Sequence, residues 1–321
     1  MDLGDHDVVV IGAGVIGLTC AVSLAEAGAR VRVLAESIPG VTSTAAGALW
    51  GPYLVEPKER VRAWALESFA AFRVLAAGNT PGVKMTAGVD ASRTAGPPPD
   101  FADMVPGLQA VAAPELPAGF AQGVRYVAPL VDMPAYLAYL RQRLHDAGGT
   151  DSTIIVDTLT SAVGLAPIVV NCTGIGARHF VPDSGVFPIR GQLVVLDNPG
   201  IDEWFSEDTG ESPDLLHWYP HGDALVLGGV AQPGDWRVVP DPATAAAIIH
   251  RCAAVEPRIA AAKILAHRAG LRPTRRAVRL DVQNIPGCRV VHCYGHGGAG
   301  VTLSWGCAAE VRSLAANLTY K

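Results

Sequence analysis

The sequence has few of the features that mark nucleic-acid, membrane or zinc-binding proteins. Its six cysteines contain no C-x-x-C pair, which argues against a zinc ribbon and a thioredoxin-type redox site. Charged residues make up only 17% of the chain, without long runs, and the net charge of −5 does not favour a nucleic-acid partner. The acidic, polar start is no secretory signal, and no apolar segment approaches a membrane span. We therefore expect a cytoplasmic protein without a metal, whose cysteines serve as small apolar residues in a reducing compartment.

Hydrophobic residues, in contrast, are abundant. They make up 50% of the 321 residues, so a large core is available and the chain is long enough for two domains. Residues 7–11 are apolar after Asp7 and mostly β-branched, which predicts a strand buried on both faces. A helix is expected over 18–27, ending at Gly28, and a second strand over 30–34.

A glycine-rich turn joins this first strand to the helix and has the pattern G-x-G-x-x-G. Gly12 permits a tight turn, Gly14 lets backbone amides reach a pyrophosphate, and Gly17 lets the helix pack closely against the strand. Glu36 follows the second strand at the distance expected for a carboxylate that binds the adenosine ribose. The pattern predicts a dinucleotide site that also includes Ala13, Val15 and Ile16, but it does not separate NAD from FAD.

The segment after Glu36 is rich in small and hydroxyl residues. Such residues suit close contact with a large planar cofactor, and the alternative is a polar loop that leads into a core at Leu49 and Trp50. The cofactor interpretation includes Thr42, Ser43, Thr44, Ala46, Gly47, Ala48 and Leu49.

Seven blocks along the chain occur in the order found in one flavoenzyme family. They are V-V-V-I-G-A-G-V-I-G-L-T at 8–19, A-G-A-L-W-G-P-Y at 46–53, V-V-N-C-T-G at 169–174, R-G-Q at 190–192, L-G-G-V at 227–230, G-L-R-P at 270–273, and the stretch 290–306. With these blocks the sequence resembles the D-amino-acid oxidase family, FAD enzymes of the same broad fold as glycine and sarcosine oxidases. Actinobacterial members look the most similar.

The order of the expected elements indicates an α/β protein with two interleaved domains. Residues 1–52, 133–180 and 286–321 would form a discontinuous, Rossmann-type FAD-binding domain, which includes an amphipathic helix over 133–144 and a closing helix over 301–318. Residues 53–132 and 181–285 would form a mostly antiparallel β substrate-binding domain, with strands at 224–227 and 277–281.

Arg272 is the leading candidate for substrate binding. A guanidinium fork suits a carboxylate, and Pro273 restricts Arg272 to extended geometry. From the residues alone it could equally be a surface cation, because three further arginines follow at 275, 276 and 279. The resemblance implies that Arg272 binds the α-carboxylate of the substrate and also contacts the cofactor.

The other expected contacts follow from the resemblance. A tyrosine usually assists the arginine, and its place falls at His217, although Tyr219 points to the same face of a strand. The tyrosine that animal members carry on a mobile lid has no counterpart in residues 205–212, which puts lid gating in doubt. Ala231 occupies the position where D-aspartate oxidases have an arginine, so neutral or apolar D-amino acids are the expected substrates. Leu159 and Thr173 complete the expected cofactor contacts.

The stretch 290–306 contains His292 and His296, four residues apart. On a strand these two lie about 13 Å from each other, so we expect no metal there. Glycines 297, 298 and 300 instead let the backbone pass against the flavin ring, followed by Val301 and Thr302 at the start of a helix. A carbonyl near Gly298 would accept a hydrogen bond from the substrate amino group.

The resemblance implies oxidation of D-amino acids by hydride transfer from Cα to flavin N5. Hydrolysis then yields a 2-oxo acid and ammonia, and dioxygen is reduced to hydrogen peroxide. Alternatives are an oxidase of glycine, sarcosine or acidic D-amino acids, an NAD-dependent dehydrogenase, and a non-catalytic dinucleotide sensor. We expect a monomer or homodimer that binds small molecules and no nucleic acid or membrane.

Overall fold

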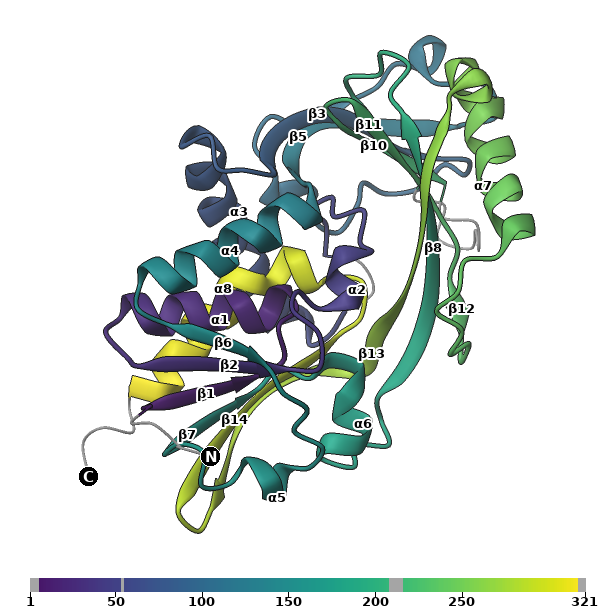
Figure 1. Ribbon diagram of the computed structural model, residues 1–321. Helices are drawn as coiled ribbons and strands as arrows, with labels where there is room; N and C mark the ends of the chain where they lie inside the picture. Colours follow the sequence, from purple (N-terminus) through teal and green to yellow (C-terminus); the bar gives the residue numbers. More distant parts are fainter. Residues whose placement is uncertain (1–5, 53–54, 208–215, 317–321) are drawn as a thin grey trace.

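The computed structural model describes residues 6–52, 55–207 and 216–316. Over these ranges the chain forms one 14-stranded sheet, in the order β4-β5-β3-β9-β10-β11-β8-β13-β14-β7-β1-β2-β6, with β12 beside β8. Helices lie against both ends of this sheet (Figure 1). The mixed α/β fold class expected from the sequence is confirmed.

Parallel strands make up the end of the sheet that contains the N-terminus. They are β1 (Val8–Ile11), β2 (Val31–Ala35), β6 (Thr150–Thr153), β7 (Ile168–Asn171) and β14 (Cys288–His296), paired as β6-β2-β1-β7-β14. All four residues of β1 are buried, as expected for a continuous apolar run in a parallel sheet. The first two strands thus lie where the sequence predicts them.

Three helices pack over these strands: α1 (Val15–Glu26), α4 (Met133–Asp146) and α8 (Gly300–Ala316) (Figure 1). Residues 15–25 of α1 are all buried, because this helix packs against the sheet and against both of the other helices. The amphipathic helix expected over 133–144 is confirmed as α4, with Leu137, Leu140 and Leu144 fully buried.

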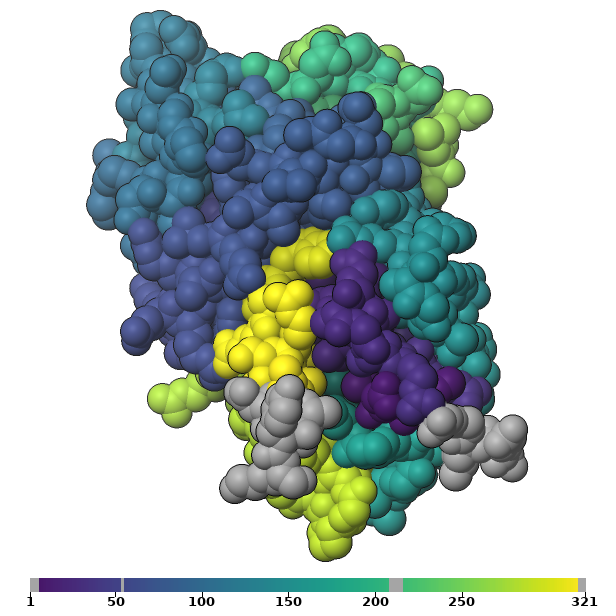
Figure 2. Space-filling view, turned by 90° about the vertical axis from the view of Figure 1, so that its left-hand side faces the viewer, coloured from purple at the N-terminus to yellow at the C-terminus, as the bar shows by residue number. Residues whose placement is uncertain are grey.

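Helix α3 (Lys58–Ala77) also packs against α8. A side chain at Gly306 would come within 2.3 Å of Trp64 Cα, so glycine allows the two helices to touch. Trp64 Nε1 donates a 2.7 Å hydrogen bond to Glu310. Figure 2 shows α8 in yellow between α3 in blue and α1 in purple. The domain boundaries stay a prediction. They assign α3 to the second domain, although α3 contacts α8 of the first.

The other end of the sheet is mostly antiparallel. Its strands are β3 (Val83–Ser92), β4 (Gln109–Ala110), β5 (Gln122–Val131), β8 (Phe187–Asp197), β9 (Trp204–Glu207), β10 (His217–His221), β11 (Ala224–Gly228), β12 (Gln232–Pro233) and β13 (Ile264–Ile285), with α7 (Pro242–Val255) packed on one side. Short helices and turns are α2 (Val41–Thr44), α5 (Leu159–Ala162), α6 (Ala177–Phe180), η1 (Ala102–Met104), η2 (Ala113–Glu115), η3 (Gly174–Gly176) and η4 (Pro257–Ala261).

Strand β13 joins the two ends of the sheet. Its first half pairs with β8 and its second half with β14, and the register shifts between Thr274 and Arg279. Such an irregularity bends a strand and increases its twist, so one 22-residue strand passes from the antiparallel part into the parallel part. Within the described ranges, none of the helices combines the length and the apolar character that crossing a membrane requires.

Candidate functional site

A cavity of about 1290 Å³ lies where the two ends of the sheet meet. Its walls come from the turn between β1 and α1, the segment 35–52, the end of β7, strands β9, β10 and β13, and the start of α8. Pockets for drug-sized ligands usually measure about 300–1,000 Å³. The cavity is therefore large enough for a dinucleotide together with a small substrate.

The turn between β1 and α1 forms the nucleotide end of this cavity. Gly12 has φ +110°, and a Cβ there would lie 2.3 Å from the Cys172 carbonyl oxygen. A Cβ on Gly17 would lie 1.9 Å from the Gly12 carbonyl oxygen. Both positions therefore require glycine, and the amino end of α1 faces the cavity through residues 13–16, where its dipole favours phosphate. Glu36 lines the same cavity just beyond β2.

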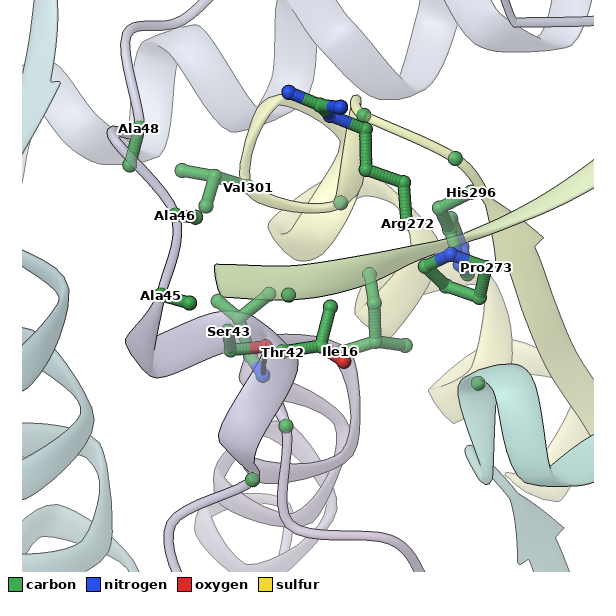
Figure 3. A pocket seen from close by; sticks show the side chains of 18 of the residues that line it. Ile16, Thr42, Ser43, Ala45, Ala46, Ala48, Arg272, Pro273, His296 and Val301 are labelled. Carbon is green, nitrogen blue, oxygen red and sulfur yellow. Dashed lines mark hydrogen bonds between the residues drawn. The ribbon is translucent and has the colours of Figure 1, made fainter. Parts of the chain in front are cut away.

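The segment after β2 lies along the cavity with its small side chains. Thr42, Ser43, Ala46, Gly47, Ala48 and Leu49 all line it, and Figure 3 shows Ala45, Ala46 and Ala48 in sequence along one wall. Ser43 Oγ accepts a 2.9 Å hydrogen bond from Val15 N, which ties this segment to the start of α1. Thr44 does not fit the expectation: its hydroxyl donates to the Gly40 carbonyl and the residue borders a separate hollow beside α4. The helical turn of α2 directs it away from the cavity.

The turn between β14 and α8 forms a further part of the cavity wall. Gly297, Gly298, Gly300 and Val301 line the cavity, as does Thr173 at the end of β7. Thr302 does not, because its buried hydroxyl donates to the Gly51 carbonyl at 3.0 Å and accepts from Gly51 N at 3.1 Å. Leu159 packs with the apolar cluster behind the parallel strands and is also outside the cavity wall. The expected direct cofactor contacts of these two side chains are not supported by this geometry.

His292 is a fully buried residue that supports the cavity from behind. Its Nε2 lies 2.9 Å from Gln283 Oε1, and its Nδ1 lies 3.1 Å from Asn171 Nδ2. Asn171 Oδ1 in turn accepts hydrogen bonds from the backbone and hydroxyl of Thr173. Burial lowers the pKa of His292 to about 4, so the ring is neutral near pH 7. His292 therefore positions Thr173 through Asn171, although His292 itself does not line the cavity.

Replacing His292 with alanine should therefore reduce stability more than activity. We expect the free energy of unfolding to fall by about 2–3 kcal/mol, because a cavity forms and the buried amide of Asn171 loses a hydrogen-bond partner. Chemical denaturation measures this loss, and kcat/KM should change less than about threefold. His250→Ala, on the exposed face of α7, is the control. A large loss of kcat/KM at unchanged stability would contradict this role.

Arg272 lies in the cavity and not on the surface. Its Nη1 donates a 3.0 Å hydrogen bond to the Val230 carbonyl, and a side chain at Gly191 would come within 2.8 Å of the guanidinium. Figure 3 shows the side chain extending away from β13 into the space that Val301 also faces. Arg275 pairs with Asp183, and Arg279 with Asp281. The surface-cation alternative for Arg272 is thus wrong.

His217 and Tyr219 lie side by side on β10 and both line the cavity. Their rings are stacked, with centroids 4.4 Å apart and an interplanar angle of 15°. Burial raises the pKa of Tyr219 well above its usual range, so the hydroxyl keeps its proton. A Cβ on Gly47 would lie 3.0 Å from the Tyr219 ring, which brings the small-residue segment against this pair.

Two buried acidic side chains of the cavity wall were not expected from the sequence. Asp90 on β3 and Glu207 on β9 are both buried, and Glu207 forms an ion pair with Arg93. The two carboxylates belong to strands far apart in the sequence and to no recognisable pattern.

Of the segment 205–212, residues 208–212 lie outside the described residues, so the expectation of a missing lid tyrosine is untested there.

Comparisons with known proteins agree with this geometry. The family model described as FAD dependent oxidoreductase matches residues 7–314. A D-amino-acid oxidase of Streptomyces coelicolor is 49% identical over 319 residues, which cover 98% of each chain. A D-amino-acid oxidase of Rubrobacter xylanophilus is 47% identical over 311 residues, covering 96% of this chain and 95% of the relative. The solved glycine oxidase of Bacillus cereus superposes with a TM-score of 0.81 at 19% identity, covering 98% of both chains. The chain belongs to the family of FAD-dependent oxidoreductases.

Proposed function

We propose that this protein oxidises neutral and apolar D-amino acids to 2-oxo acids, ammonia and hydrogen peroxide. The observation that carries the proposal is the guanidinium of Arg272 inside the cavity that begins at the dinucleotide turn. Similarity over nearly the full length to two D-amino-acid oxidases supports it. The expected cytoplasmic location and the oligomeric state stay predictions.

The residues of the cavity fit FAD. The glycine turn at 12–17 and the amino end of α1 suit the pyrophosphate, Glu36 suits the ribose, and the glycines of the β14–α8 turn leave room for a flat ring. When bound, FAD supplies the hydride acceptor and passes the electrons to dioxygen. The small residues 45–48 would face the ring from the other side of the cavity.

Arg272 would hold and orient the substrate. Its planar fork can donate two parallel, charge-assisted hydrogen bonds to an α-carboxylate, and the Val230 carbonyl fixes the plane of the guanidinium. A backbone carbonyl near Gly298 would accept a hydrogen bond from the neutral amino group. With two groups of Cα held in this way, one hydrogen is directed at the cofactor, so the arrangement selects one enantiomer.

An acidic side chain of the wall supports a preference for uncharged substrates. A second carboxylate on the substrate would enter a cavity that Asp90 borders, and burying like charges together is costly, whereas the charge of Glu207 is compensated by Arg93. Ala231 is not itself part of the cavity wall. The expected preference therefore rests on the Asp90 carboxylate and not on the size of Ala231.

We propose that the Tyr219 hydroxyl assists Arg272 in carboxylate binding. Tyr219 and Arg272 line the same cavity. Tyr219→Phe should raise KM for D-alanine about tenfold, the effect of losing one hydrogen bond of about 1–1.5 kcal/mol. His217→Phe keeps a flat ring against Tyr219 and should change KM less than about threefold. The reverse pattern would assign the hydrogen bond to His217.

Anaerobic addition of D-alanine to the purified protein tests the activity directly. The flavin absorbance should bleach with D-alanine and persist with L-alanine. A panel of D-valine, D-aspartate, glycine and sarcosine with peroxide detection then ranks the substrates. Turnover of glycine or sarcosine alone would overturn the proposal in favour of a related amine oxidase. A colourless protein that takes up no FAD would overturn every oxidase assignment.

A further inference from the structure

Four cysteines and one histidine gather beside the cofactor cavity. Cys20 lies on α1, Cys172 just after β7, Cys293 and His296 on β14, and Cys307 on α8. All five are buried, with Cys20 and Cys307 fully inaccessible and Cys172 the most accessible at 8%. The mechanism proposed above uses none of these side chains.

Their ligand atoms form two groups that share Cys293. The sulfur atoms of Cys20, Cys172 and Cys293 all lie within 4.8 Å of one another, and so do those of Cys293 and Cys307 with a ring nitrogen of His296. His296 Nε2 lies 3.6 Å from Cys307 Sγ and 3.9 Å from Cys293 Sγ. In a tetrahedral zinc site, sulfur and nitrogen ligands are about 3.5 Å apart, given Zn–S of about 2.3 Å and Zn–N of about 2.0 Å.

We propose that Cys293, His296 and Cys307 form a binding site for a thiophilic divalent cation such as Zn²⁺ or Cd²⁺. On binding, two S–H bonds break, two metal–sulfur bonds and one metal–nitrogen bond form, and two protons leave to solvent without any change of oxidation state. The two thiolates balance the charge of the cation. The complex is therefore neutral, which matters in a site with almost no solvent exposure.

The cavity provides the route to this site. Cys172, Cys293 and His296 are part of the cavity wall, whereas Cys20 and Cys307 lie behind it. A cation that enters the cavity therefore meets Cys293 and His296 before it reaches Cys307. Since the β14–α8 turn begins at His296, an ion held there would sit directly behind Gly297 and Gly298, next to the proposed flavin position.

Cadmium titration of the purified full-length chain, with its thiols reduced and oxygen excluded, tests the site. Binding is read from the thiolate-to-cadmium charge-transfer absorbance and from the metal that remains after desalting. We expect one cadmium ion per chain in the unchanged protein. Cys307→Ala and Cys293→Ala should each weaken binding at least about tenfold. Cys288→Ala is the matched control, because Cys288 is buried on the same strand but outside both groups.

The comparison of variants also locates the ion. Cys20→Ala should keep the cadmium band, because Cys20 belongs only to the all-cysteine group. Loss of the band in Cys20→Ala but not in Cys307→Ala would overturn the ligand assignment. An unchanged protein that shows no more cadmium absorbance than Cys293→Ala would overturn the site itself, and the thiols would then be ordinary core residues. Circular dichroism checks that each variant is folded, and His296→Gln replaces any variant that is not.

Discussion

Replacing Arg272 with leucine should lower kcat/KM for D-alanine by about a thousandfold or more. Leucine removes both charge-assisted hydrogen bonds to the carboxylate, each worth about 1.5–3 kcal/mol, and leaves the substrate carboxylate without a cationic partner. The flavin content should stay close to that of the unchanged protein, because the substitution does not alter the nucleotide turn at 12–17. Steady-state kinetics and the flavin absorbance measure the two effects separately.

Two controls define what the arginine contributes. Arg272→Lys keeps the charge without the planar fork, so an intermediate loss is expected. Arg276→Leu removes an exposed arginine from the same strand and should leave kcat/KM unchanged. If Arg272→Leu turned over D-alanine at the normal kcat/KM, Arg272 could not be the carboxylate receptor.

A single methyl group at Gly17 should abolish stable flavin binding. The new Cβ would lie 1.9 Å from the Gly12 carbonyl oxygen. This oxygen belongs to the backbone, so it cannot rotate away as the end of a flexible side chain could. Gly17→Ala therefore forces α1 away from the turn that holds the pyrophosphate. We expect the free energy of unfolding to fall by about 3 kcal/mol or more and the protein to be purified without its yellow colour.

Gly28→Ala is the matched control for this substitution. Gly28 follows the other end of α1 with φ +94°, but a Cβ there meets nothing within 4 Å. This variant carries only backbone strain of about 1 kcal/mol and should keep its flavin. Gly17→Ala with normal stability and normal flavin content would show that close packing at Gly17 is not required.

The first 36 residues illustrate how far local sequence predicts structure. The buried strand, the glycine turn, the helix and the second strand each follow from short-range patterns: runs of apolar residues and glycines at positions that tolerate no Cβ. The same holds for α4, whose leucines recur with helical spacing. Gly12 and Glu36 line the cavity, and their role as nucleotide contacts was predicted from neighbouring residues alone.

Other features depend on contacts between segments far apart in the sequence. Thr302 is close to the cavity along the chain, yet its hydroxyl bonds to Gly51, some 250 residues away. Which arginine of the cluster enters the cavity depends on β13 pairing with β8, where Gly191 leaves room for Arg272. The packing of α3 against α8 likewise has no local signal.

The sequence by itself determined the fold class and the dinucleotide-binding turn, because periodicity and glycine positions act within a few residues. Only the tertiary structure decided which side chains share a space, because that depends on the pairing of segments separated by up to the length of the chain. The cysteines show this difference most clearly. With no C-x-x-C pair they predict nothing beyond small apolar residues, but the tertiary structure brings four of them and His296 into two adjoining groups that share Cys293.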